Sequence, residues 1–141
     1  MGYWLAKSDP DTYGWPELVR DGMTTWDGVR NYKARNFLRA MKPGDIVLFY
    51  HSGDEKSIVG AMKVLSEPHA DTTSDEDIWT AVDVAPEWTL KSPVTLSRIK
   101  AEPTLKNIHL VREGRLSVMP LEKKDFDLLV SLGGGPVKMK A

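Results

Sequence analysis

The chain has 141 residues and a mass of 15.8 kDa, the size of one domain, and 41% of its residues are hydrophobic. Its 19 basic and 20 acidic residues leave a formal charge of -1, so any phosphate contact must come from a local patch rather than from a generally basic molecule. Cysteine is absent, which excludes disulfide scaffolds, thiol nucleophiles and cysteine-ligated zinc or iron–sulfur sites.

The sequence predicts neither a membrane segment nor a metal site. No run approaches the ~18 apolar residues of a membrane span. The charged Lys7 interrupts the start of the chain before a signal-peptide core forms. The three histidines, His51, His69 and His109, show no two-histidine helical spacing. We therefore expect a soluble cytoplasmic protein with no metal and no cofactor.

Short elements are predicted at the start of the chain. Residues 3–6 predict a strand, and residues 15–20 predict a short helix with Pro16 near its first position. Residues 23–26 predict a further extended piece.

The clearest predicted helix covers residues 31–41. Its apolar residues fall at positions i, i+3, i+4 and i+7 and form one stripe: Ala34, Phe37, Leu38 and Met41. At ~100° per residue, Arg35, Arg39 and Lys42 gather on one flank of that stripe. We expect a helix that is anchored on one side and basic beside it.

The middle of the chain predicts strands. Residues 45–52 contain an uninterrupted apolar run, typical of a strand buried on both faces, and residues 57–65 predict its hairpin partner. Gly60 predicts a bulge or kink in that partner. Residues 68–77 form an acidic loop, and residues 78–84 alternate as a further strand.

The last third is more mixed. Residues 95–100 are ambiguous, residues 116–119 predict a short strand, and residues 121–132 predict a last helix that a glycine run ends at residues 133–136. Residues 136–141 are expected to form a flexible tail.

The order of these elements predicts the fold class. Several strands alternate with short helices, and the strands are too closely spaced for repeated βαβ units. We expect residues 1–135 to form a single α+β domain, a small curled mixed sheet or barrel with helices at its rims.

Charge is unevenly distributed along the chain. Residues 29–42 hold five basic residues and no acid, residues 67–87 hold seven acids and no lysine or arginine, and residues 91–124 are again mostly basic. Such runs occur on ordinary solvent-exposed faces. Alternatively, one basic face of the protein approaches phosphates and an acidic face points away from them.

Residues 26–36 are the most informative stretch for function. Trp26 and Tyr32 flank Arg30 and Asn31 at the start of the predicted helix. An aromatic ring stacks on a base, an asparagine amide pairs with a base edge, and arginine binds phosphate or guanine. The alternative interpretation is a core tryptophan beside solvent-facing arginines. Two further clusters, at residues 7–10 and 112–117, are weak signals on their own.

Taken together, these stretches resemble the EVE domain family of the PUA-like superfamily. The matching motifs occur in the family's order over residues 2–132, at residues 3–10, 26–36, 44–52, 58–60 and 115–120. Eukaryotic members carry a basic N-terminal extension that is absent here. The resemblance therefore implies a bacterial, cytoplasmic protein, or a nuclear one if the source is eukaryotic.

The resemblance implies a pseudo-barrel with a pocket that recognises a modified base, such as modified cytosine in DNA, or RNA. Asp9 stands where the family usually has glutamate and Lys33 where it often has glutamine, which puts the identity of the base in doubt more than the fold. The ligand-binding residues implied by the motifs are Lys7, Ser8, Asp9, Trp26, Arg30, Asn31, Tyr32, Arg35, Tyr50, His51, Ser52, Arg115 and Ser117.

Two classes of function compete. The first is a monomeric binding module in which a base stacks on Trp26 while arginines hold the nucleic-acid backbone. The second is a small nucleotide- or nucleic-acid-processing enzyme with His51 as general base, although the sequence supplies no activated nucleophile. A protein-interaction adaptor using the acidic residues 67–87 is a further alternative. We expect a binding module without catalytic residues.

Overall fold

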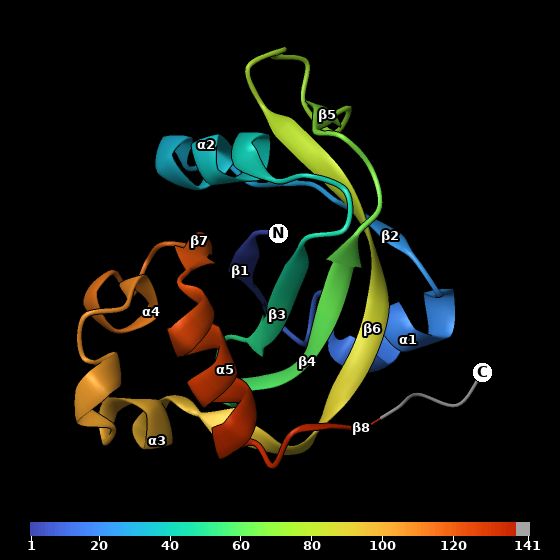
Figure 1. Ribbon diagram of the computed structural model, residues 1–141. Helices are drawn as coiled ribbons and strands as arrows, with labels where there is room; N and C mark the ends of the chain where they lie inside the picture. Colours follow the sequence, from blue (N-terminus) through green and yellow to red (C-terminus); the bar gives the residue numbers. More distant parts are fainter. Residues whose placement is uncertain (138–141) are drawn as a thin grey trace.

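In the computed structural model, which describes residues 1–137, a curled mixed sheet forms the body of the molecule (Figure 1). β1 (Tyr3–Ser8) pairs in parallel with β3 (Ile46–His51) and antiparallel with β7 (Val118–Leu121). β4 (Ser57–Val64) follows on the other side of β3, and β6 (Thr80–Thr95) lies beyond it. The predicted α+β class with a curled sheet is confirmed.

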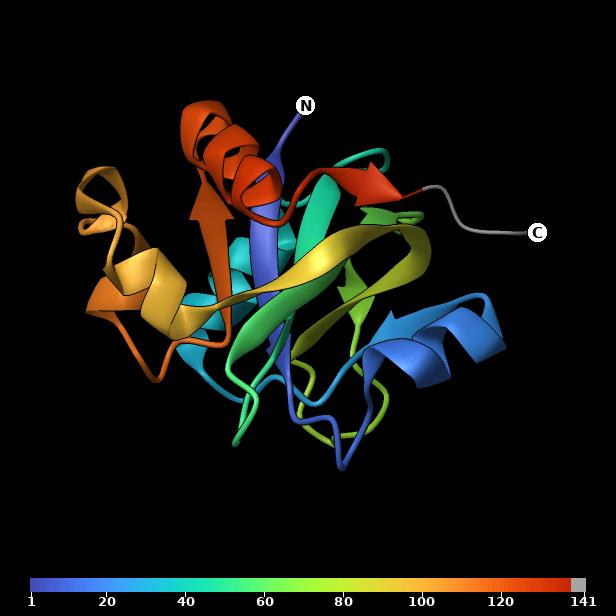
Figure 2. The same ribbon diagram turned by 90° about the horizontal axis from the view of Figure 1, so that it is seen from below.

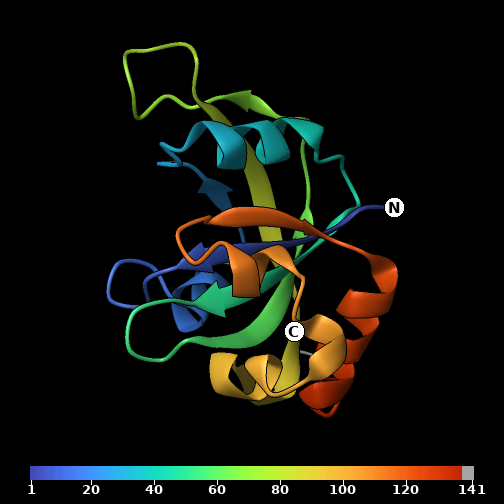
Figure 3. The same cartoon turned by 90° about the vertical axis from the view of Figure 1, so that its left-hand side faces the viewer.

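β6 is the longest strand of the sheet. It has 16 residues and runs from the end of the molecule near α2 (Tyr32–Ala40) to the end near α3 (Leu96–Lys100), as Figures 1 and 3 show. Besides β4 it pairs with three short strands, β2 (Thr24–Trp26), β5 (His69–Ala70) and β8 (Pro136–Val137).

The strand predicted over residues 78–84 was therefore too short. The flexible tail predicted over residues 136–141 was placed to begin too early. Pro86 lies inside β6, where the pairing with β4 shifts register between Ala61 and Met62 and so accommodates a residue without an amide hydrogen. Near the C-terminus, Pro136 and Val137 form β8, which pairs with β6, and so belong to the sheet rather than to the tail. Residues 138–141 of the predicted tail lie outside the described residues.

The helices lie at the rims of the sheet, as predicted. α1 (Trp15–Asp21) and α5 (Lys123–Leu132) lie on opposite sides of strands β3 and β4 (Figure 2). The ambiguous residues 95–100 are mostly helical because the Thr95 side chain accepts a hydrogen bond from the Arg98 amide and caps α3. A short 3-10 helix, η1 (Pro103–Leu105), and α4 (His109–Arg112) follow.

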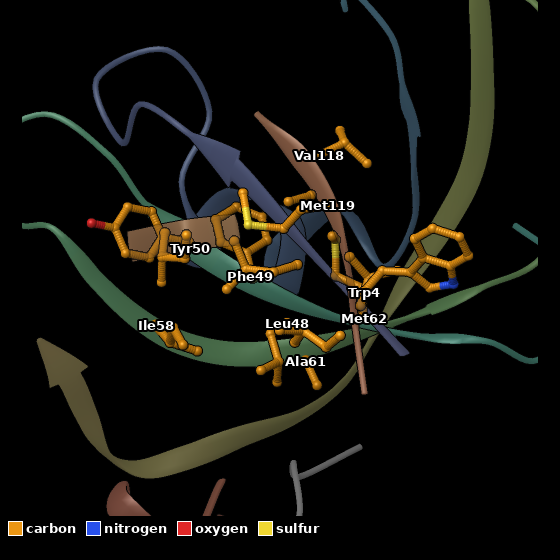
Figure 4. Packing of buried hydrophobic residues seen from close by; sticks show 14 of the residues in the cluster. Trp4, Leu48, Phe49, Tyr50, Ile58, Ala61, Met62, Val118 and Met119 are labelled. Carbon is orange, nitrogen blue, oxygen red and sulfur yellow. The ribbon is translucent and has the colours of Figure 1, made fainter. Parts of the chain in front are cut away.

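Phe49 of β3 lies at the centre of the hydrophobic core (Figure 4). Its fully buried ring makes edge contacts with Trp15 and Trp26 at centroid distances of 5.4 and 5.5 Å. Offset and edge-to-face pairs of this kind stabilise a core by ~0.5–1.5 kcal/mol beyond the area that they bury. The two tryptophans thus tie α1 and β2 to the middle of the sheet.

A buried carboxylate aligns β1 with β3. Asp45 precedes β3 and accepts hydrogen bonds from the Gly2 amide at 2.9 Å, the Trp4 indole at 3.0 Å and the Lys42 amide at 3.0 Å. Because a buried charged group is costly unless it is hydrogen-bonded, this arrangement favours a single register for the parallel pair.

Gly60 in β4 has no room for a side chain. A Cβ atom at this position would lie 2.5 Å from Cζ2 of Trp15. We expect Gly60→Ala to lower the free energy of unfolding by ~1–3 kcal/mol, because the buried ring must move. Urea denaturation measures the change. Gly114→Ala, where nothing lies within 4 Å, is the matched control and should change stability by less than about 0.5 kcal/mol. Equal effects for the two variants would contradict this packing account.

Candidate functional site

A cavity of about 640 Å³ lies between the end of β1 and the segment that joins β2 to α2. Its volume is within the ~300–1,000 Å³ of typical ligand sites. Lys7 and Ser8 at the end of β1 line this cavity, and so does Ser117, which directly precedes β7. The cavity is lined by Lys7, Ser8, Thr12, Tyr13, Thr24, Thr25, Trp26, Asp27, Gly28, Val29, Arg30, Asn31 and Ser117.

The structure brings six of the residues implied by the sequence motifs to this one cavity. They come from three segments that are far apart in the chain: Lys7, Ser8, Trp26, Arg30, Asn31 and Ser117. The segments meet because β1 pairs with β7 and because the amide of Lys7 donates to the Ser117 carbonyl at 2.9 Å. Lys7 and Trp26 therefore line the same cavity, whereas Tyr50 and Arg115 do not line it.

The other implied residues lie elsewhere. Tyr50 and His51 are buried, with 3% and 5% of their surface exposed, and neither lines the cavity. Arg115 lines a smaller neighbouring cavity of about 300 Å³ together with Asn31 and Lys33. The remaining four lie outside both cavities: Asp9, Tyr32, Arg35 and Ser52.

Several lining residues were missed by the sequence reasoning. Asp27 and Gly28 lie within residues 26–36, the stretch most informative for function, so their neighbours Trp26 and Arg30 could have pointed to them. Tyr13 lies in the loop before α1, where no motif pointed to a site. The full set of missed residues is Thr12, Tyr13, Thr24, Thr25, Asp27, Gly28 and Val29.

Trp26 is at once a core residue and a cavity residue. Only 9% of its surface is exposed, and its ring meets Phe49 edge-on with an interplanar angle of 88°. Truncating a buried aromatic side chain of this kind costs ~3–5 kcal/mol of stability. The two interpretations of Trp26 offered by the sequence are therefore not exclusive, and its replacement by alanine would perturb the fold as well as the cavity.

Asn31 has a fixed orientation at the cavity. Its side-chain oxygen accepts a hydrogen bond from the Ala34 amide at 2.9 Å and caps α2. Because an amide N–H can only donate, this bond assigns Oδ1 to the helix and leaves the side-chain NH₂ group as a donor. Asn31 lines both the larger and the smaller cavity.

Two charged side chains in the cavity have shifted pKa values. Burial lowers the pKa of Lys7, whose ammonium donates to the Gly114 carbonyl at 3.0 Å and lies 5.7 Å from the centroid of the Tyr50 ring. Partial burial raises the pKa of Asp27, and the neighbouring carboxylate of Asp71 raises it further. The cavity therefore offers both a cation and a carboxylate.

Asp71 holds the segment from Gly28 to Arg30 in place. Its buried carboxylate accepts hydrogen bonds from the Gly28 amide and the Arg30 guanidinium, both at 2.8 Å, and from Thr73. Burial alone would raise the pKa of Asp71, but the hydrogen bonds from Thr73, Arg30 and Gly28 outweigh it and hold the pKa well below its usual range. Gly28 adopts a φ of 77°, which favours glycine at this turn.

A further cavity of about 520 Å³ lies between α4 and the start of α5, away from these residues. It has a mixed lining that includes His109, Glu122 and Asp125. Within residues 1–137, no three histidine or acidic side chains gather in the way that a metal ion needs. Over the same residues, every helix is too short or too polar to cross a bilayer.

Comparison with known proteins identifies close relatives. The EVE domain family model matches residues 2–132. Human thymocyte nuclear protein 1 is 37% identical over 92% of this chain and 73% of its own length. A crystal structure from Agrobacterium tumefaciens superposes with a TM-score of 0.93 at 36% identity, covering 99% of this chain and 100% of that one. The human THYN1 protein in complex with 5-methylcytosine-containing DNA superposes with a TM-score of 0.89 at 34% identity, covering 94% and 98%.

The Asp71 carboxylate yields a prediction about stability and pH. We expect Asp71→Asn to lower the free energy of unfolding by ~1.5–3 kcal/mol near pH 7, because charge-assisted hydrogen bonds to a buried group are lost. Since the folded pKa of Asp71 lies below the unfolded value of 3.8, this stabilisation is complete above about pH 4 and is lost as the pH falls further. Denaturation curves between pH 7 and pH 3 measure it. A difference between the two proteins that stays constant to the lowest pH would contradict the assignment.

Proposed function

The chain belongs to the EVE domain family, and we propose that it binds nucleic acid and takes a modified base, such as 5-methylcytosine, into the cavity beside β1. One observation carries the proposal: the human THYN1 protein, with almost the same fold, forms a complex with DNA that contains 5-methylcytosine. DNA is therefore the proposed partner, and RNA is the second candidate.

The cavity has the polar groups that a base edge requires. Asn31 offers an NH₂ donor, Ser117 offers a hydroxyl, and Asp27 offers a carboxylate that accepts hydrogen bonds from an amino group such as that of cytosine. Ser8 donates its own proton to the Tyr13 carbonyl at 2.6 Å, so its oxygen remains as an acceptor. These groups discriminate between bases by pairing or failing to pair with them.

The cations around the cavity supply the contacts to the backbone. Extruding a base costs a few kcal/mol, and stacking returns only ~1–3 kcal/mol per base. The remaining affinity must come from phosphates. Arg115 and Lys33 line the smaller cavity on the other side of Asn31, although Lys33 is paired with Glu113 in the free protein. Lys7 lines the larger cavity, as does Arg30, which is paired with Asp71 in the free protein.

We propose a binding module rather than an enzyme because of the position of His51. Its Nε2 accepts a hydrogen bond from the Trp15 amide at 2.9 Å, and its Nδ1 lies 2.7 Å from a Glu55 carboxylate oxygen. A general base needs a ring nitrogen that reaches the substrate. Both nitrogens of His51 are engaged within the fold, and its side chain lies outside the cavity lining.

The acidic residues 67–87 support the fold in part, which weakens the adaptor alternative. Asp71 binds Arg30, and Asp83 accepts hydrogen bonds from Thr25 at 2.9 Å while lying 3.0 Å from His69. We propose that the protein acts as a monomer wherever it meets nucleic acid, in the cytoplasm of a bacterium or in the nucleus if the source is eukaryotic.

Asn31→Asp tests the cavity directly. Aspartate caps a helix as well as asparagine does, so the fold should be kept, while the NH₂ donor is replaced by a negative charge. We expect the affinity for an oligonucleotide with one 5-methylcytosine to fall by at least about tenfold, the equivalent of one hydrogen bond of ~1.4 kcal/mol. Fluorescence anisotropy measures it.

Two controls complete that test. Asn31→Ser keeps the cap without adding a charge and should weaken binding less. The same oligonucleotide with unmodified cytosine should bind the wild-type protein more weakly. Unchanged affinity in a folded Asn31→Asp protein would exclude the cavity as the site of the base.

The salt dependence of binding tests the phosphate contacts. Replacing a residue that neutralises one phosphate should reduce the slope of log K against log salt by ~0.9 for duplex DNA or ~0.7 for a single strand. We expect this change for Arg115→Gln in titrations between low and moderate salt. Arg20→Gln, which alters an exposed arginine paired with Asp21 on α1, should leave the slope as it is. Identical slopes for both variants and the wild type would remove Arg115 from the interface.

A further inference from the structure

An exposed aromatic ring lies just outside the cavity. Tyr32, the first residue of α2, is 60% exposed, and its ring is stacked on Trp79 with a centroid distance of 5.2 Å and an interplanar angle of 24°. Figure 3 shows the start of α2 beneath the loop that leads into β6, from which Trp79 comes. Tyr32 directly follows Arg30 and Asn31, which line the cavity, yet lies outside that lining.

The support beneath this ring is rigid. Trp79 is 7% exposed, and its carbonyl accepts a hydrogen bond from the Asp71 amide at 3.1 Å. Arg39 of α2 donates to the Ile78 carbonyl at 2.8 Å and to the Thr80 hydroxyl at 2.9 Å, which fixes the residues on both sides of Trp79. The Tyr32 ring is therefore exposed to solvent on a buried tryptophan whose carbonyl and two neighbouring residues are hydrogen-bonded.

Two guanidinium groups lie near the stacked pair. The guanidinium of Arg30 lies 5.4 Å from the Trp79 ring centroid, and that of Arg35 lies 5.0 Å from the Tyr32 ring centroid. Arg30 is neutralised by Asp71, whereas Arg35 forms no ion pair with a carboxylate among residues 1–137 and bonds only to Asn36 and the Ile78 carbonyl. The Arg35 guanidinium lies over the exposed Tyr32 ring, and no carboxylate among residues 1–137 holds it there. An unpaired base can therefore displace it from the ring and stack in its place, while the guanidinium contacts the phosphate.

We propose that Tyr32 and Arg35 form a second nucleotide subsite, which takes the nucleotide next to the one whose base enters the cavity. The flanking base stacks on Tyr32, and its phosphate contacts Arg35. This inference rests on the proposed function, since it concerns the same bound strand. The sequence motifs attribute Tyr32 and Arg35 to the pocket, whereas this inference places them at a separate site on the surface. The flanking nucleotide must not be base-paired if it is to stack there.

The test compares two probes with one variant. We expect Tyr32→Ala to weaken the binding of a single-stranded trinucleotide with central 5-methylcytosine by about 5- to 150-fold, the equivalent of ~1–3 kcal/mol of stacking. Binding of the mononucleotide 5-methyl-dCMP, which fills only the cavity, should not change. Tyr32→Phe, which keeps the ring, should bind both probes as the wild type does. NMR titration measures all the affinities.

A second measurement separates stacking from an indirect structural effect. We expect 2-aminopurine, placed beside the 5-methylcytosine, to lose fluorescence on binding to the wild-type and Tyr32→Phe proteins and to keep it on binding to Tyr32→Ala. Arg35→Gln should reduce the salt slope for the trinucleotide by ~0.7, while Arg98→Gln, on α3 at the opposite end of the molecule, should not (Figure 1).

The outcomes distinguish this inference from the function on which it rests. If Tyr32→Ala binds the trinucleotide as tightly as the wild type, or weakens both probes equally, the second subsite is overturned while the cavity remains the site. If the wild-type protein binds neither probe and no methylated oligonucleotide, the proposed function falls together with the inference.

Discussion

The buried carboxylate of Asp71 is the interaction on which both proposed nucleotide contacts depend. It binds the Gly28 amide and the Arg30 guanidinium, and so fixes the segment that forms one wall of the cavity. Its own amide binds the carbonyl of Trp79, the residue on which Tyr32 stacks. Because a buried carboxylate is costly unless its oxygens accept hydrogen bonds, the hydrogen bonds from Thr73 also stabilise this arrangement. The Asp71 residue thus connects the cavity wall, Arg30 and the stacked rings of Trp79 and Tyr32.

The site is rigid because it is built on the core of the sheet. Trp26 lines the cavity while its ring packs on Phe49, and Lys7 and Ser8 lie at the end of a strand that is paired on both sides. A pre-formed cavity of this kind keeps the entropic cost of ordering the protein low when a ligand binds. It also explains why Trp26 is a poor position for a functional test, whereas Asn31, whose capping role aspartate and serine can share, is a good one.

The parts of the fold that local chemistry determines could be predicted from the sequence. The stripe of Ala34, Phe37, Leu38 and Met41 predicted α2 within a residue at each end, and the apolar run in residues 45–52 predicted β3. The length of β6 could not be predicted, because Pro86 argues against a strand and only the register shift in β4 accommodates it. Six of the predicted site residues line the larger cavity, but the arrangement of the whole set could not be predicted. Tyr50 pairs with Lys7 across the β1–β3 ladder yet is buried, and Tyr32 follows Asn31 yet lies outside the cavity.

The most direct measurement is a set of amide NMR spectra of the ¹⁵N-labelled protein, recorded during titration with an oligonucleotide that contains one 5-methylcytosine. The account predicts that the largest chemical-shift changes occur at Ser8, Gly28 and Ser117, which line one cavity and come from three distant segments. Changes concentrated at His109 and Glu122, around the cavity near α4 and α5, would contradict it. So would spectra that remain unchanged at low salt.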